Sequence, residues 1–144
     1  MSTGGERRLR IAGIHHITVL CRSLERSVAF YRNLLGMRVV ELGPGPDDPN
    51  ARRLVFGDDG GAPGTLITCL EYPHLKRGTV GTGSTHHFAL TVESADELEG
   101  WRAYLTSRGV PCSETLDRGS HRSLYLRDPD GHVVELATIG PGGA

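Results

Sequence analysis

The chain repeats one order of elements twice, and each copy opens with a pair of histidines. The first pair lies in G-I-H-H-I-T-V-L, over residues 13–20, and the second lies in S-T-H-H-F-A-L-T-V, over residues 84–92. Both stretches are rich in β-branched and apolar residues, as strands are, and a segment with helical spacing follows each of them. The chain is therefore expected to hold two copies of one β-α-β-β-β unit.

Each expected helix has a start signal and a stop signal. Ser23 has the residue type of an N-cap, and Gly36 supplies the stop. In the second copy, Ser94 and Glu97 form a capping box, and Gly109 supplies the stop. Strands are predicted over residues 14–20, 37–42, 53–57 and 65–70 in the first copy, and over 87–92, 110–113, 123–127 and 132–137 in the second. These predictions give an α+β fold class with two β-α-β-β-β modules.

Glycine-rich segments separate and flank the two modules. We predict a flexible tail over residues 1–10, a first module over 11–71, a linker over 72–83, a second module over 84–139 and a tail over 140–144. The linker contains G-T-V-G-T-G, which has neither the spacing nor the strand-to-helix setting of a dinucleotide fingerprint. No nucleotide-binding loop is expected there.

The composition excludes several classes of function. With 144 residues, 38% hydrophobic and 23% charged, the chain is typical of one soluble globular domain. A net charge of -1 gives no reason to expect nucleic acid, and no apolar run is long enough to span a membrane. The N-terminus has no apolar segment of the secretory type. Cys21, Cys69 and Cys112 are widely spaced, which favours reduced thiols and a cytoplasmic location.

Alternation of side chains along a strand separates the two members of each histidine pair. The more apolar face of each first strand should pack against its helix. This leaves His16 and His87 on the opposite, more polar face. The same argument places His15 and His86 on the far face, toward the helix.

Later strands add a tyrosine and a carboxylate to the polar face. Tyr125 is expected there by alternation, and Glu135 lies among apolar neighbours, where burial of a carboxylate demands a partner. The repeat places Thr68 at the position of Glu135, so the first copy lacks a matching carboxylate. His16, His87 and Glu135 would form a facial triad of two imidazoles and one carboxylate, which leaves coordination positions open on a metal.

These motifs resemble the vicinal oxygen chelate superfamily, which includes glyoxalases, fosfomycin-resistance enzymes, bleomycin-binding proteins and extradiol dioxygenases. The resemblance is carried by H-H-I-T, by R-S-V-A-F-Y-R-N-L-L-G over residues 26–36, and by Y-L-R-D-P-D-G-H-V-V-E-L over residues 125–136. It covers residues 11–138. It implies paired β-α-β-β-β modules whose curled mixed sheets form a cup around a metal.

Two further stretches are similar to ring-cleaving dioxygenases of the hydroquinone type. They are F-G-D-D-G-G-A-P-G-T-L-I-T, over residues 56–68, and the G-T-V-G-T-G before the second histidine pair. This resemblance implies iron(II) as the metal, with Mn(II), Zn(II) or Ni(II) as alternatives, and His16, His87 and Glu135 as its ligands. The other residues that it implies at the site are Thr18, His15, His86, Arg118 and Tyr125. Enzymes of that branch carry more modules in one chain, so a homodimer with composite sites is expected here.

Three functions remain open. The leading hypothesis is a non-haem iron(II) dioxygenase that cleaves a hydroquinone or catechol-type ring with O₂. In it, Tyr125 would donate a hydrogen bond or proton, Arg118 would stabilise the substrate anion, and a histidine outside the ligand set would accept the phenol proton. The second is a glyoxalase-like isomerase or thiol transferase that uses the metal as a Lewis acid. The third is a drug-binding protein that needs no metal.

Overall fold

The computed structural model describes residues 7–141, which form two four-stranded mixed sheets. The strands of the first sheet are β1 (His16–Cys21), β2 (Arg38–Pro44), β3 (Arg52–Gly57) and β4 (Leu66–Glu71), in the order β1-β4-β3-β2. Those of the second are β5 (Phe88–Val92), β6 (Leu116–Asp117), β7 (Arg122–Arg127) and β8 (Val133–Thr138), in the order β5-β8-β7-β6. In each sheet the first strand runs parallel to the last, and the other neighbours are antiparallel. The α+β fold with two β-α-β-β-β modules is confirmed.

The helices begin where the sequence signals predict. The Ser23 hydroxyl caps α1 (Leu24–Ser27), and the Ser94 hydroxyl accepts a hydrogen bond from the Glu97 N–H at 3.1 Å to cap α2 (Ala95–Ser107). The first helix was expected to be a single α-helix. Instead α1 continues as the π-helix η1 (Val28–Leu34). Among residues 7–141, none of these helices is long and apolar enough to cross a membrane.

The strand that the sequence predicts directly after the second helix is reduced to one bridge, between Cys112 and Leu126. The Ser113 hydroxyl accepts the Tyr125 N–H at 2.9 Å, where a regular ladder would use a backbone carbonyl. Regular pairing resumes at β6, which covers two residues. Of the predicted tails, residues 1–6 and 142–144 lie outside the described residues.

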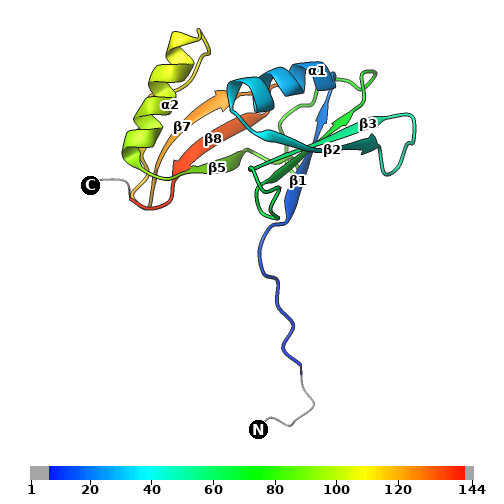
Figure 1. Ribbon diagram of the computed structural model, residues 1–144, viewed down its shortest axis with the longest axis horizontal. Coiled ribbons are helices and arrows are strands. Elements are labelled where there is room, and N and C mark those ends of the chain that lie inside the picture. Colours follow the sequence, from blue (N-terminus) through cyan, green and yellow to red (C-terminus); the bar gives the residue numbers. More distant parts are fainter. Residues whose placement is uncertain (1–6, 142–144) are drawn as a thin grey trace.

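Both helices pack on the same side of the two sheets (Figure 1). The Tyr104 hydroxyl of α2 donates a hydrogen bond to the Leu34 carbonyl at 2.9 Å, which holds the second helix against the end of η1. One apolar core runs under both helices, and it includes the fully buried Leu98 and Leu105 of α2. The opposite faces of the sheets carry no helix, so side chains such as His16 and Thr18 of β1 are exposed.

A buried hydrogen bond joins the two modules. The Tyr31 hydroxyl of η1 donates to the Asp128 carboxylate at 2.7 Å, and the side chain of Tyr31 is 0% exposed. The other Asp128 oxygen accepts the backbone N–H groups of Asp130 and His132, each at 2.9 Å, which shapes the turn before β8. The His132 ring in turn contacts the Leu20 carbonyl of β1 at 2.9 Å. The turn is therefore a structural link between the modules.

We predict that Tyr31→Phe lowers the free energy of unfolding by about 1–3 kcal/mol, because a buried carboxylate loses its hydroxyl partner. Burial and the adjacent Asp128 raise the pKa of Tyr31, so the hydroxyl stays protonated and keeps donating at ordinary pH. Urea denaturation measures the change. Tyr72→Phe is the control, since its partly exposed hydroxyl makes no hydrogen bond within the described residues. Equal stability of the two variants would contradict the prediction.

Candidate functional site

The second sheet brings a histidine and a buried carboxylate into contact. In the parallel pair β5–β8, Ala89 lies opposite Glu135, so His87, two residues before Ala89, ends beside the glutamate. The distance from His87 Nε2 to Glu135 Oε1 is 2.8 Å. Glu135 is only 4% exposed, and a carboxylate at that depth is costly unless it is paired. The sequence anticipated this need for a partner.

The second oxygen of the carboxylate is held by a histidine that sequence reasoning missed. His121 Nε2 lies 3.1 Å from Glu135 Oε2. His121 precedes β7 and has the same strand parity as Tyr125. Alternation extended one step before the strand would have placed it on the polar face with Tyr125. The predicted strand begins at Ser123, so alternation was not applied to His121.

Tyr125 and Arg118 lie beside this cluster. Tyr125 is the cross-strand partner of Glu135 in the β7–β8 pair, and its ring meets the His87 ring edge to face, with centroids 5.6 Å apart. Arg118 Nη2 donates to the Tyr125 hydroxyl at 3.1 Å, and its guanidinium lies 5.4 Å from the centre of the Tyr125 ring. A cation and a hydroxyl donor thus lie on the same face as the carboxylate.

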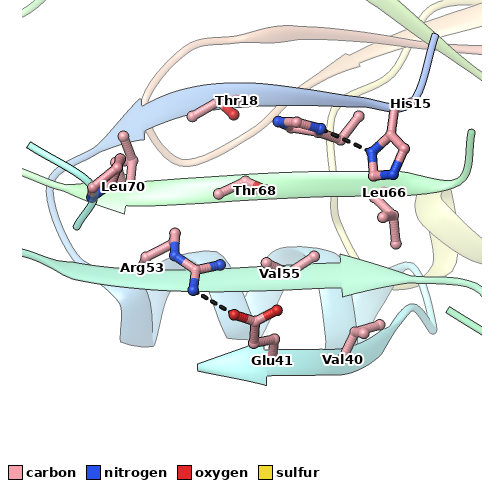
Figure 2. Close-up of a pocket in the computed structure, with 11 residues that line it drawn as sticks. His15, Thr18, Val40, Glu41, Arg53, Val55, Leu66, Thr68 and Leu70 are labelled. Atoms are coloured by element: carbon pink, nitrogen blue, oxygen red, sulfur yellow. Dashed lines mark hydrogen bonds and ion pairs between the residues drawn. The ribbon is translucent and has the colours of Figure 1, made fainter. Parts of the chain in front are cut away.

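The first sheet carries its own cavity, of about 260 Å³ (Figure 2). Side chains of β1 and β4 line it, among them His16, Thr18 and Thr68. Across the cavity Arg53 of β3 forms an ion pair with Glu41 of β2. The polar face of the first sheet therefore presents imidazole, hydroxyl and guanidinium groups.

His15, the first histidine of the first pair, does not lie where strict alternation places it. His15 lines the same cavity as His16, because β1 begins at His16 and the residue before it is free of the strand pattern. The Nδ1 atoms of His15 and His16 are 3.1 Å apart, and those of His86 and His87 are 2.8 Å apart. In both pairs the Nδ1 of the second histidine is engaged by the first. Its Nε2 is then the nitrogen available to a metal.

The pairing registers support the expected asymmetry between the copies. Thr18, two residues after His16, lies opposite Thr68, just as Ala89 lies opposite Glu135. Thr68 therefore stands at the position that Glu135 occupies in the second sheet. The first sheet offers a histidine at the repeat-related position but a hydroxyl where the second sheet offers a carboxylate.

One chain does not bring the three predicted ligands together. Within residues 7–141, no group of three histidine, cysteine, aspartate or glutamate side chains is arranged to hold a metal ion. His87 and Glu135 are in contact, whereas His16 lines a separate cavity on the first sheet. The donor set of imidazole nitrogen and carboxylate oxygen suits a divalent transition metal. The residues present fit such a metal, provided that a third ligand reaches them.

A solved structure and two curated proteins are similar to this chain. A candidate dioxygenase from Bacillus subtilis superposes with a TM-score of 0.82 at 30% identity, over 89% of this chain and 41% of the other. A chlorohydroquinone/hydroquinone 1,2-dioxygenase of Sphingobium indicum is 31% identical over 91% of this chain and 42% of its own length. The chain thus spans less than half of these relatives. The metallothiol transferase FosB of Staphylococcus epidermidis is 29% identical over 89% of this chain and 84% of its own length.

The family model agrees with the topology of the two modules. It matches residues 13–136, from the glycine before the first histidine pair to the leucine after Glu135. This range includes both histidine pairs and all eight strands except the last residues of β8. The chain belongs to the Glyoxalase/Bleomycin resistance protein/Dioxygenase superfamily.

Proposed function

We propose that two copies of this chain form a homodimer with two composite metal centres. Each centre would take His16 from one copy and His87 with Glu135 from the other. The separation of these ligands within one chain supports this arrangement, as does the exposure of the β1 face, where Leu20 is 50% exposed. A symmetric pair would complete both centres at once.

We further propose that the dimer is a ring-cleaving dioxygenase for a hydroquinone or catechol-type substrate, with iron(II) as its metal. The observation that carries this proposal is the buried Glu135 beside His87, next to a tyrosine and an arginine. The two-histidine, one-carboxylate set with open positions is the set of non-haem iron(II) oxygenases. The similarity to a hydroquinone 1,2-dioxygenase supports the substrate class.

The bound metal would supply a Lewis-acidic centre with open positions for substrate and O₂. The surrounding side chains would handle charge and protons. Arg118 would stabilise the substrate anion, while the Tyr125 hydroxyl, which accepts a hydrogen bond from Arg118, can donate its own proton to an oxygen of the substrate. His15 and His86 would fix the orientation of their neighbouring ligands, and either could accept the phenol proton. Thr18 would line the substrate cavity.

A metallothiol transferase is the second candidate function. The observation that favours it is the similarity to FosB, which is 29% identical over 89% of this chain. Such an enzyme would use the same ligands without consuming oxygen. For either function we expect a cytoplasmic protein, since the three cysteines are free thiols, as in a reducing compartment.

We predict that His16→Ala, His87→Ala and Glu135→Ala each lose most of the affinity for divalent metal, because each removes one of three protein ligands. Metal content after anaerobic purification with iron(II) measures the effect. His132→Ala is the control, since His132 contacts the Leu20 carbonyl at the module junction. Stoichiometric metal of unchanged affinity in all three ligand variants would rule out the proposed centre.

We predict that the iron(II)-loaded protein consumes O₂ when given hydroquinones or catechols, and that Tyr125→Phe lowers the rate about 100- to 10,000-fold, as loss of an acid–base group typically does. An oxygen electrode measures the rate, and bound iron shows whether the metal centre is intact. Metal-dependent transfer of a thiol without O₂ uptake would instead favour the transferase. A Tyr125→Phe rate within about twofold of the parent would exclude the hydroxyl from catalysis.

A mixing experiment tests the composite centres. We predict that inactive His16→Ala and inactive Glu135→Ala subunits regain about a quarter of the parental activity after random exchange, since about half of the dimers are mixed and each carries one intact centre. Exchange is followed by labelling the two variants with different fluorophores. A mixture of His16→Ala with His87→Ala should regain the same fraction of activity. A mixture of His87→Ala with Glu135→Ala should stay inactive, because every centre then lacks one ligand. Complete exchange without recovered activity would place each centre within one chain.

A further inference from the structure

The Glu135 carboxylate has two different histidine partners. His87 contacts Oε1 at 2.8 Å and His121 contacts Oε2 at 3.1 Å. The Glu135 side chain is 6% exposed, whereas that of His121 is 33% exposed. The oxygen that faces the proposed ligand His87 is therefore not the oxygen that His121 holds. Oε1 is thus the oxygen beside the proposed ligand, and Oε2 is the oxygen beside His121.

Polar contacts at both ring nitrogens, Nδ1 and Nε2, fix the position of the His121 ring. Ser120 Oγ lies 2.9 Å from His121 Nδ1, and the His121 carbonyl accepts the Arg118 N–H at 2.8 Å. An ionised carboxylate can only accept, so Nε2 must carry the hydrogen that points to Glu135. Nδ1 then accepts from the Ser120 hydroxyl. Ser120 and the Arg118–His121 turn therefore hold the His121 ring in place as a hydrogen-bond donor to Glu135 Oε2.

A ligand role for His121 does not agree with the geometry. His121, His87 and Glu135 lie close together, yet no group of three such side chains in the described part of the chain is arranged to hold a metal. His121 Nε2 contacts Oε2, whereas the proposed ligand His87 contacts Oε1. His121 acts on the site through the carboxylate.

We propose that His121 is a positioning residue for Glu135, which restricts the glutamate to binding the metal through Oε1 alone. This inference rests on the proposed metal centre. A carboxylate free to rotate could bind through both oxygens and occupy one more coordination position. By holding Oε2, His121 keeps that position open for substrate. Partners that orient a metal ligand typically contribute 10- to 100-fold in metal affinity or activity.

The test uses Co(II) added to the metal-free chain of 144 residues, with visible absorption reporting both affinity and coordination number. We expect His121→Ala to weaken Co(II) binding about 10- to 100-fold and to change the absorption bands, because Oε2 becomes free to bind. His121→Gln retains an N–H donor and should lie closer to the parent in both measurements. Ser120→Ala should shift them in the same direction as His121→Ala, by a smaller factor.

Two controls frame the result. His74→Ala removes an exposed histidine of the linker and should leave the spectrum unchanged, whereas His87→Ala removes a proposed ligand. If His121→Ala binds Co(II) with the affinity and absorption bands of the parent, the positioning role is wrong, but the proposed metal centre is not contradicted. Loss as complete as in His87→Ala, without recovery in His121→Gln, would make His121 a ligand and overturn the proposal. A parent protein that binds no Co(II) would refute both the metal centre and this inference.

The serine variant guards against a folding defect. Ser120 is exposed, so Ser120→Ala is expected to fold, and circular dichroism checks every variant. If His121→Ala does not fold, the decision passes to Ser120→Ala and His121→Gln. Weakened Co(II) binding in Ser120→Ala with near-parental binding in His121→Gln supports the positioning role. Parental binding in Ser120→Ala counts against it.

Discussion

The parallel pairing of the first and last strands in each module is the constraint on which the candidate site depends. It places side chains that are far apart in sequence, such as His87 and Glu135, beside each other on one face. The same pairing in the first sheet sets Thr18 opposite Thr68. A parallel pair requires a long crossover, and here the helix and two strands of the module supply it. The site is thus a consequence of module topology rather than of a local motif.

Burial of Glu135 links the stability of the second sheet to its chemistry. A carboxylate that is 4% exposed needs compensating donors, and His87 and His121 provide them before any metal is bound. Binding of a metal between His87 and Glu135 would replace one hydrogen bond and leave the other in place. In the proposed centre, His121 would preorganise the carboxylate without binding the metal itself.

Much of this arrangement could be predicted from the sequence, because repeat alignment and strand alternation are physical rules. They placed Glu135 and Tyr125 on the polar face and Thr68 at the position that matches Glu135. Alternation failed for His15, since the residue before a strand is not bound by its period. His121 was missed because it lies in the turn that precedes β7, although it keeps the parity of Tyr125. The residue just before a strand can therefore break the two-residue period, as His15 does, or keep it, as His121 does.

The asymmetry between the copies decides which pairings of sheets can build a three-ligand centre. Two first sheets would bring together two copies of His16, with Thr68 where a carboxylate is needed. Two second sheets would bring together four ligands and bury two carboxylates against each other, where repulsion opposes their ionised forms. A first sheet facing a second sheet supplies His16, His87 and a single Glu135. In the proposed dimer, divergence at one strand position, threonine in one copy and glutamate in the other, would favour that pairing.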